Sequence, residues 1–300
     1  MTYSIVARDP DQGDLGVAVQ SHWFAAGIVC WAEAGVGAVA TQASALIDHG
    51  PLALDLMRSG KSASEALAER VAMDEERAHR QVAVLDAHGG VAVHTGESCI
   101  PEAGHRIGDG FSCQANMMRR DTVWDAMTVA FETTWGDLAD RFLAALEAAE
   151  AEGGDIRGKQ AARILVVRGE RTEKPWEDVL VDVRVDDHPK PLHELARLLR
   201  LKRAYDHEER ASELSDAGDV EAAAKESEAA FALVPGNPEL SFWTAVRMAT
   251  QYDMIEQARP ILRSALGDDP GWRELLRRLG QRRLSGLTPE AAERLLRDGD

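Results

Sequence analysis

Short β-rich runs, bounded by polar turn segments, alternate with helical patterns along the first part of the chain. Residues 2–8 and 16–23 are two such runs that predict β-strands, and the polar segment 9–14 between them contains the Pro and Gly of a turn. We therefore expect these two runs to form an antiparallel hairpin. Two further runs, at 27–31 and 35–41, predict a second pair of strands.

Helical periodicity alternates with further strand patterns up to about residue 185. A helix is expected at 51–57, and Ser62 with Glu65 three residues later has the spacing of a capping box that begins another helix. A long helical stretch at 122–150 is expected to break near Gly136. The remaining strands are expected at 81–86, 91–94, 111–115, 162–168 and 179–185.

The order of these elements indicates the fold class. Strand runs that are separated from helix runs favour an α+β fold over a doubly wound parallel sheet. Two helix pairs separated by antiparallel strands predict a four-layer α-β-β-α sandwich for residues 1–190. From about residue 190 the pattern is helical almost to the end, so residues 191–300 are expected to form a second, all-α domain.

The helical tail has the spacing of tetratricopeptide-like repeats. Asp219 and Asp253 are 34 residues apart, as are Ala224 and Ala258, and this is the length of such a repeat. Each repeat ends in a loop that contains Pro. Two repeats are visible, whereas stacked arrays need three or more, so we expect the tail to lean on the first domain or on a second subunit of a homo-oligomer. A generic helical cap is the alternative.

Composition then limits the function classes. The formal charge of −17 argues against binding to a nucleic-acid backbone, which needs clustered Lys and Arg. The sequence shows neither a secretion signal nor an apolar run of the roughly 20 residues that a membrane span needs, so a cytoplasmic protein is expected. Cys30, Cys99 and Cys113 lack CxxC spacing and are expected to be reduced thiols.

Thr2 is the strongest candidate for chemistry, because it follows Met1 at the start of the first predicted strand. Aminopeptidases generally remove Met before a residue this small, which would leave Thr2 with a free α-amine. A hydroxyl nucleophile and a base to activate it would then lie on one residue. Thr is also a common second residue, so an ordinary chain start is the alternative, and the choice depends on what surrounds Thr2 in the fold.

The predicted hairpin places polar residues beside Thr2. If the two strands pair across a short turn, Thr2 lies opposite residue 23, give or take two for the turn type. Gln20, Ser21 and His22 are then its neighbours. A solvated strand end is the alternative interpretation of Ser21 and His22.

These features together resemble the N-terminal nucleophile hydrolase superfamily, which includes proteasome β-subunits and glutamine amidotransferase domains. The run 17–21 is similar to the second-strand segment of proteasome-type subunits, with Gln20 in the place of an acidic residue. The Lys that those subunits carry on the third strand has no counterpart at 27–31. The resemblance implies that Thr2 is the nucleophile and that Gln20 and Ser21 support it.

Further segments match the superfamily in the same order along the chain. Gln42 and Ala43 follow the end of a predicted strand, at the junction where the superfamily supplies a backbone N–H to an oxyanion hole. The segment 108–116 takes the place of a segment that touches the nucleophile, so Asn116 is a candidate side-chain donor. Asp155 stands where an Asp steadies the amino terminus, although it is also a candidate turn residue or helix cap. The expected substrate-binding residues are His22, Gln42, Ala43, Gln114 and Gln160.

One bacterial family is a closer match. The start Thr-Tyr-Ser-Ile-Val-Ala-Arg-Asp, the block Ala-Gly-Val-Gly-Ala-Val-Ala-Thr-Gln at 34–42 and Val-Asp-Asp-His-Pro at 185–189 together resemble the family of unknown function DUF1028. The resemblance covers about residues 2–200 and implies an N-terminal nucleophile hydrolase fold. Some members carry a C-terminal extension for which peptidoglycan binding has been suggested, and the tail would correspond to it. Ala161 stands where many relatives are expected to carry Ser, so specificity is expected to differ.

The resemblance leads to one expected activity and two alternatives. We expect hydrolysis of a small amide or peptide-like C–N bond, with the Thr2 α-amine as base and no cofactor. The first alternative is a catalytically silent scaffold whose helical tail binds a partner protein or a cell-wall peptide. The second is a metal hydrolase that uses His94, His105 and His188, although their spacing matches no compact ligand motif.

Overall fold

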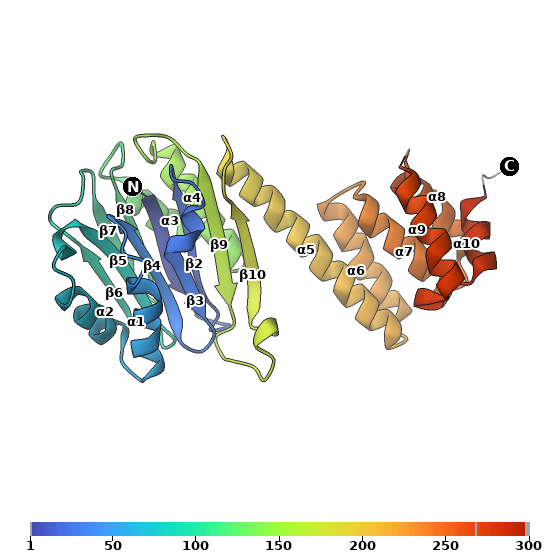
Figure 1. The fold of residues 1–300 in the computed structure, drawn as a ribbon, viewed down its shortest axis with the longest axis horizontal. Helices are drawn as coiled ribbons and strands as arrows, with labels where there is room; N and C mark the ends of the chain where they lie inside the picture. Colours follow the sequence, from blue (N-terminus) through green and yellow to red (C-terminus); the bar gives the residue numbers. More distant parts are fainter. Residues whose placement is uncertain (1, 268, 298–300) are drawn as a thin grey trace. The chain divides into compact units, whose positions relative to one another are not determined.

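The computed structural model describes residues 2–267 and 269–297 (Figure 1). By their internal contacts the residues form two compact units, Met1–Leu199 and Arg200–Asp300. This division by contacts falls inside the long helix α5 (Pro191–Asp216), whereas the sequence places the boundary at residue 190.

The first unit contains two antiparallel sheets (Figure 1). The larger sheet has six strands in the order β10-β9-β2-β1-β8-β7, and the smaller sheet has four in the order β3-β4-β5-β6. The strands are β1 (Thr2–Arg8), β2 (Leu15–Ser21), β3 (Cys30–Glu33), β4 (Gly37–Ala43), β5 (Arg80–Asp86), β6 (Val91–Thr95), β7 (Gly104–Gly108), β8 (Phe111–Asn116), β9 (Ala161–Val167) and β10 (Val179–Val185). The mixed α+β fold with antiparallel sheets that the sequence predicts is confirmed.

Helices cover the outer face of each sheet. The helices α1 (His49–Arg58) and α2 (Ala63–Ala72) pack on the smaller sheet. On the larger sheet lie α3 (Val123–Thr133) and α4 (Leu138–Ala151), separated near Gly136 as predicted. A third core fills the space between the two sheets.

The predicted hairpin forms in a register two residues away from the central expectation. Thr2 pairs with Ser21, because Asp9 and Asp14 close the turn between β1 and β2 with a backbone hydrogen bond of 2.7 Å. This register is within the margin of two residues that different turn types allow. It places Ser21 directly beside Thr2.

Side chains along β1 alternate between two environments. Tyr3 and Ile5 lie in the core under α3 and α4, whereas Val6 lies in the core between the sheets. Because successive side chains of a strand point to opposite faces, Thr2 and Ser4 face the smaller sheet together with Val6. The alternation therefore turns the Thr2 hydroxyl toward the interior between the sheets.

Two details of the strand prediction are wrong. Residues 27–31 are not one strand, because a 3₁₀-helical turn at Ala26–Val29 precedes β3. The absence of a side chain at Gly27 lets Arg163 pack closely against this turn, since a Cβ on Gly27 would lie 2.8 Å from Arg163 Cδ. Strand β7 has no alternating signal because it is an edge strand whose residues are all at least partly exposed.

The second unit is helical, as the sequence predicts. After α5 follow α6 (Val220–Leu233), α7 (Pro238–Gln251), α8 (Ile255–Leu266), α9 (Pro270–Arg282) and α10 (Pro289–Leu296). Asp219, Asn237 and Asp269 cap three of these helices by accepting hydrogen bonds from first-turn N–H groups. Among the described helices of the chain, none combines the length and the apolar character that crossing a lipid bilayer requires.

The 34-residue spacing in this unit does not match its packing at every position. Ala258 is buried in α8, whereas Ala224 is exposed in α6 and its neighbour Ala223 is the buried residue. The first residues of α6 and α8, Val220 and Ile255, are accordingly 35 residues apart. The distance along the chain between these two helices is therefore one residue longer than the 34-residue spacing of the sequence pattern.

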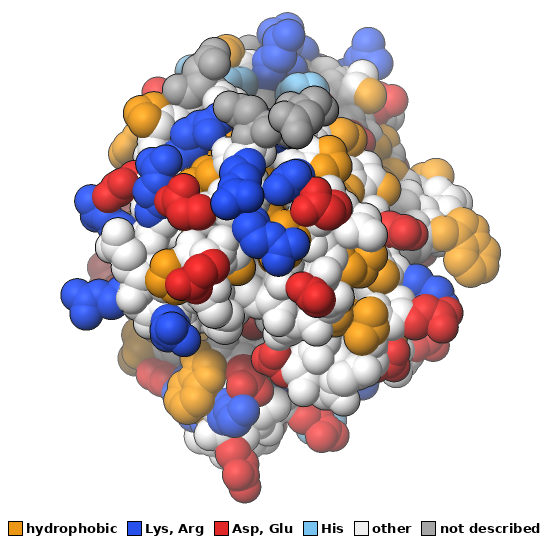
Figure 2. Space-filling view, turned by 90° about the vertical axis from the view of Figure 1, so that its right-hand side faces the viewer, with side chains coloured by type: hydrophobic (Ala, Val, Ile, Leu, Met, Phe, Trp, Pro, Cys, Tyr) orange, Lys and Arg blue, Asp and Glu red, His pale blue; other side chains and the backbone are white. Residues whose placement is uncertain are grey.

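Basic side chains gather toward the end of the described chain. Residues 270–297 carry seven Arg and three Glu, although the whole sequence has a formal charge of −17. Figure 2 shows Lys and Arg side chains gathered in the upper part of one face, with acidic and apolar side chains scattered among them. Three of these Arg residues form ion pairs, Arg277 with Glu293, Arg278 with Glu274 and Arg294 with Glu256. Exposed pairs of this kind contribute little to stability.

Candidate active site

Thr2 is the first residue of β1 and is held from both sides. It pairs with Ser21 of β2 and with Asn116 of β8, and it is 4% exposed. Chain ends usually fray unless the structure ties them down. A reactive group on Thr2 would therefore have a fixed position. Met1 lies outside the described residues, so its removal stays a prediction.

The hydroxyl and the carbonyl of Thr2 have different partners. Thr2 Oγ1 donates a hydrogen bond to Ser21 Oγ at 3.1 Å. The Thr2 carbonyl accepts from Gln42 Nε2 at 3.3 Å and from Asn116 Nδ2 at 3.4 Å. The backbone of Thr2 is thus anchored by two side-chain amides.

Gln81 connects these two amides, and the sequence analysis does not identify it. Its Oε1 accepts from Gln42 Nε2 at 2.7 Å and from Asn116 Nδ2 at 2.9 Å. Its own Nε2 donates to the Ala115 carbonyl at 3.0 Å. A Gln at the start of an otherwise apolar strand is the signal that would have indicated it. Asn116 therefore anchors the backbone of Thr2, because both N–H groups of the Asn116 side chain already donate to acceptors, the Thr2 carbonyl and Gln81 Oε1.

Gln114 lies deeper between the sheets. Its Nε2 donates to Ser4 Oγ at 2.7 Å, and Ser4 Oγ donates in turn to Gln42 Oε1 at 2.7 Å. Ser112 Oγ donates to Gln114 Oε1 at 2.9 Å. Buried polar groups are stable when each has a partner, and this chain of bonds links β1, β4 and β8. The geometry therefore gives Gln114 a structural position behind Thr2.

A cavity of about 380 Å³ opens beside Thr2. It is lined by Thr2, Ser21, Trp23, Val29, Thr41, Gln42, Ala43, Ala45, Ile47 and Arg157. Pockets of roughly 300–1,000 Å³ are typical of small-molecule sites, and this one is near the lower end. Thr2, Ser21, Gln42 and Ala43, all predicted from the sequence, thus share one cavity.

The end of β4 forms one wall of the cavity. Strand β3 pairs with β4 only as far as Ala40, so the edge of β4 turned toward β3 is uncovered by that strand from Thr41 to Ala43. Ala43 has a φ of 68°, a conformation that residues other than Gly rarely adopt. Backbone strain of this kind tends to occur at functional sites.

Gln20 does not reach the Thr2 hydroxyl. It pairs with Tyr3, and the alternation of β2 turns its side chain to the face covered by helices, opposite to Ser21. Gln20 is fully buried, and both of its side-chain amide atoms lack a hydrogen-bond partner among the described residues. The geometry gives no support to a catalytic contact between Gln20 and Thr2.

Asp155 supports the strand end next to Thr2. It is 2% exposed, and its Oδ2 accepts from the His22 backbone N–H at 3.2 Å and from Arg157 Nη2 at 2.7 Å. The Gln160 backbone N–H donates to the Ser21 carbonyl at 3.1 Å. Asp155, His22 and Gln160 are thus brought together around Ser21. Arg157, which lies in a loop without a sequence signal, also reaches the cavity.

Two of the three cysteines are buried too deeply for nucleophilic chemistry. Burial raises the pKa of Cys30 and of Cys113 to about 12. Burial also raises the pKa of the half-buried Cys99 thiol. At neutral pH these side chains are protonated, and the thiolate is the reactive form. None of the three cysteines is among the described residues that line the cavity, whose hydroxyl groups belong to Thr2, Ser21 and Thr41.

Comparison with known proteins assigns the first unit to a family. A family model described as "Family of unknown function (DUF1028)" matches residues 2–195, well over half of the chain. The chain belongs to the DUF1028 family. The crystal structure of a protein from Silicibacter pomeroyi, described with the same family model, is 30% identical with a TM-score of 0.60, and the match covers 66% of this chain and 88% of that one. No curated protein matches the chain.

The DUF1028 match begins at Thr2 and ends inside α5. The candidate nucleophile is therefore the first matched residue, and the cavity lies wholly within the matched region. Most of the second unit lies outside the match. The predicted family is confirmed, and its description states no activity.

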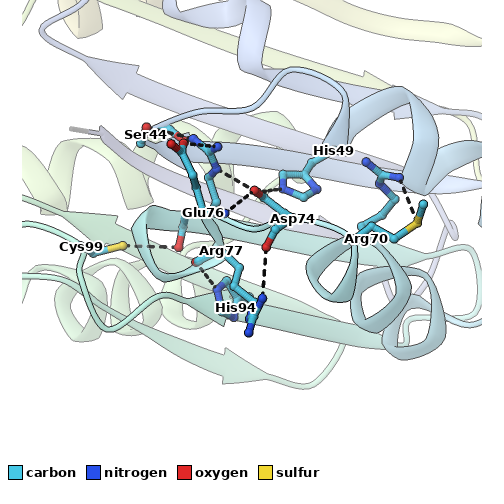
Figure 3. Close-up of polar contacts among 10 residues, drawn as sticks. Ser44, His49, Arg70, Asp74, Glu76, Arg77, His94 and Cys99 are labelled. Atoms are coloured by element: carbon cyan, nitrogen blue, oxygen red, sulfur yellow. Dashed lines mark hydrogen bonds and ion pairs between the residues drawn. The ribbon is translucent and has the colours of Figure 1, made fainter.

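A second buried polar cluster lies within the DUF1028 region (Figure 3). His49 Nε2 is 3.0 Å from Asp74 Oδ2, and Arg80 Nε donates to the same oxygen at 2.8 Å. Burial would raise the pKa of Asp74, but hydrogen bonds from Arg80 and His49 outweigh it and hold the pKa at about 2. Burial lowers the pKa of His49, which favours neutral imidazole with its proton on Nε2.

This cluster anchors a wall of the cavity, and its geometry does not pair Ser44 with His49 as nucleophile and base. Ser44 Oγ accepts from Arg80 Nη1 at 2.9 Å, so its bond runs to Arg80 and not to His49. Ser44 and His49 are the two ends of the loop that carries Ala45 and Ile47 into the cavity. Fixing both ends holds the loop in place.

The three histidines of the metal alternative lie apart in the fold. His105 is on the edge strand β7 and contacts Thr95 Oγ1 at 2.9 Å. His188 follows β10, at the opposite edge of the same sheet, and His94 is on β6 of the smaller sheet. Within residues 2–267 and 269–297, no three His, Cys, Asp or Glu side chains gather in a way that could hold a metal ion.

Proposed function

We propose that the protein is an amide hydrolase whose nucleophile is Thr2 after removal of Met1. The observation that carries the proposal is the position of Thr2, whose hydroxyl borders a 380 Å³ cavity while its carbonyl is held by Gln42 and Asn116. A nucleophile needs a fixed geometry and access to substrate. Thr2 has both features.

The layered first unit supports assignment to the N-terminal nucleophile hydrolase type. Two antiparallel sheets lie between helix layers, and the candidate nucleophile begins a central strand of the larger sheet. The DUF1028 match that starts at Thr2 is consistent with this assignment. A processed chain start would place the α-amine on the same residue as the hydroxyl.

The proposed reaction is acyl transfer to Thr2 followed by hydrolysis. The α-amine, with an ordinary pKa of about 8, accepts the hydroxyl proton at neutral pH. Thr2 Oγ1 attacks the amide carbonyl, and backbone N–H groups at the uncovered edge of β4, around Gln42 and Ala43, stabilise the oxyanion. The amine then protonates the leaving nitrogen as the C–N bond breaks. Water hydrolyses the acyl ester and regenerates Thr2.

Ser21, Asn116 and Asp155 act in this proposal by positioning. Ser21 orients the Thr2 hydroxyl through the 3.1 Å contact. Asn116 holds the Thr2 carbonyl, and Asp155 holds the chain after Ser21 through the His22 N–H. No cofactor takes part in these steps.

The experiment uses a probe that does not require the substrate to be known. A β-lactone acylates a nucleophilic hydroxyl by ring opening, so its whole mass should be added to the peptide that begins with Thr2. Intact-mass measurement should show the loss of Met1 in the same sample. Thr2→Ala should abolish labelling, by about 10³-fold or more in rate, as expected when a nucleophile is removed.

Thr2→Ser should keep labelling, because it retains a hydroxyl. Thr133→Ala is the matched control, since Thr133 is an exposed threonine on α3. Retained Met1, or labelling of Thr2→Ala at the wild-type rate, contradicts the proposal.

A second candidate is a scaffold whose C-terminal unit binds a partner. A cavity of about 720 Å³ in that unit supports it. Tyr205 and Glu209 of α5 and Trp243 and Arg247 of α7 are among its lining residues. The lining helices α5 and α7 belong to helix pairs whose spacing is close to that of tetratricopeptide-like repeats, and such arrays bind partners on extended concave surfaces.

This candidate makes a separate prediction. A cell-wall peptide added to the protein should change the fluorescence of Trp243 in a saturable way, and Arg247→Gln should weaken the change. Saturable binding together with absent lactone labelling favours the scaffold. Labelling without peptide binding favours the hydrolase alone.

A further inference from the structure

The cavity beside Thr2 is lined by polar, apolar and charged side chains in different parts. Thr2 and Ser21 form its reactive end, whereas Val29, Ala45 and Ile47 contribute apolar wall. Among the described residues that line it, Arg157 is the charged one. A ligand that matches this lining has an apolar part and an anionic part.

Arg157 is held firmly in place. Its Nε and Nη2 donate to the two carboxylate oxygens of Asp155 at 3.1 and 2.7 Å, and its backbone N–H donates to Asp155 Oδ1 at 2.9 Å. The Asp155 side chain is fully buried, whereas 31% of the Arg157 side chain is exposed. A guanidinium has five N–H donors in one plane, so it can serve a buried carboxylate and a ligand carboxylate together. Asp155 thus orients Arg157.

Arg157 lines the same cavity as Thr2 and is connected to it through a series of contacts. Thr2 bonds to Ser21, the next residue His22 donates its N–H to Asp155, and Asp155 binds Arg157. A carboxylate bound by Arg157 would therefore lie near the amide that Thr2 attacks. In an N-acyl α-amino acid, one carbon separates the amide nitrogen from the carboxylate.

The charge of the whole chain does not attract an anion. With a formal charge of −17, the protein repels an anionic substrate at long range. An anion must then be bound by donors at short range inside the site, where salt screens the attraction less. Arg157 is the charged donor among the described residues that line the cavity.

We infer that the substrate is a small N-acyl α-amino acid whose carboxylate binds Arg157. This inference rests on the proposed function of Thr2. The amide carbonyl lies at Thr2 Oγ1, and apolar groups lie along Val29, Ala45 and Ile47. Thr2 Oγ1 bonds to the acyl carbon, the C–N bond breaks, and the amino acid leaves with a proton from the α-amine. Water then releases the carboxylic acid.

The test compares substrates that differ only in the carboxylate. N-acetyl-L-leucine is paired with N-isopentylacetamide, and N-acetyl-L-phenylalanine with N-phenethylacetamide. For the wild-type protein, kcat/KM should favour the carboxylate by about ten- to a hundredfold, the range expected for a hydrogen bond between charged groups. Arg157→Gln should bring this ratio close to one, and Arg157→Lys should restore part of it.

Arg119→Gln is the matched control, because Arg119 is an exposed neighbour that contacts the Ile156 carbonyl. It should leave the ratio unchanged. A purely structural role of Arg157 would lower the rates for both substrates of a pair in proportion and leave their ratio intact. An unchanged ratio in Arg157→Gln therefore overturns the inference.

A binding measurement separates this inference from the proposed function. N-acetyl-L-leucine should raise the thermal unfolding midpoint of Thr2→Ala, N-isopentylacetamide should not, and Thr2→Ala with Arg157→Gln should lose the effect. This result with no hydrolysis by the wild type supports the carboxylate site and contradicts the hydrolase. Equal hydrolysis of both substrates supports the hydrolase and overturns the carboxylate site. Absence of carboxylate-dependent binding to Thr2→Ala also overturns it.

Discussion

At the scale of single residues, side-chain direction decides which candidates meet. Ser21 and Gln20 are neighbours in sequence, but only Ser21 faces Thr2 because strands alternate their side chains. Gln81 is 79 residues from Thr2 in the sequence. In the fold it lies beside the residues that hold Thr2, because it accepts hydrogen bonds from both Gln42 and Asn116. The identity of a residue is readable in the sequence, whereas its neighbours across sheets are not.

His49 gives a residue-scale prediction about pH. Burial lowers the pKa of His49 in the folded chain, whereas the pKa in the unfolded chain is about 6.5. Below pH 6.5, His49 therefore binds a proton more readily in the unfolded state than in the folded state. The free energy of unfolding that His49 contributes above pH 6.5 is lost as the pH falls. The loss attributable to His49 is at most about 1.4 kcal/mol per pH unit.

The measurement is the free energy of unfolding by urea between pH 7.5 and 5.5. His49→Gln keeps a hydrogen-bond donor but does not titrate, so its stability should fall less steeply than that of the wild type. Parallel curves for the two proteins would contradict the assignment. His188→Gln is a control, because His188 lies in a loop and is partly exposed.

At the scale of elements, local signals predict the hairpins and helices that lie in the first unit. The turn at 9–14 and the capping box at Ser62 are both present, with the Glu65 side chain accepting from the Ser62 N–H at 2.9 Å. The sequence does not predict strand β7, because none of its residues is fully buried and the strand therefore lacks an apolar pattern. Its hydrogen bonds to β8 come from a partner that the local pattern does not contain.

Ser62 provides the prediction at this scale. Ser62→Ala removes the acceptor for the Glu65 N–H at the start of α2 and should lower the free energy of unfolding by about 1 kcal/mol. Ser62→Thr keeps the acceptor and should lose much less. Urea midpoints at neutral pH measure both. Equal losses in the two variants would show that the cap is not the cause.

At the scale of the whole molecule, two cores divide the chain at a place that the sequence pattern misses. Leu192, Leu195 and Leu199 of α5 belong to the core under the larger sheet. Ala204 of the same helix belongs to a core of the second unit. A continuous helical pattern contains no sign of this change of partner, which lies beyond the boundary that the sequence predicts at residue 190.

Truncation tests the boundary. A fragment of residues 1–190 lacks the three α5 leucines, whereas a fragment of 1–199 keeps them. Burying a leucine stabilises a protein by about 2 kcal/mol, so the longer fragment should unfold at a clearly higher urea concentration. Leu195→Ala in the longer fragment should reproduce part of the loss. Equal midpoints for the two fragments would contradict the assignment of these residues to the first core.

The sequence by itself determined the family, the mixed α+β first unit, the helical tail and Thr2 as the candidate nucleophile. These features follow from local periodicity, turn residues and ordered motifs, which act over a few neighbouring residues. Only the tertiary structure decided that Gln20 faces away from Thr2, that Gln81 joins Gln42 to Asn116, and that Arg157 reaches the cavity. The physical reason is that strand pairing and sheet packing bring together residues whose separation in the chain carries no local signal.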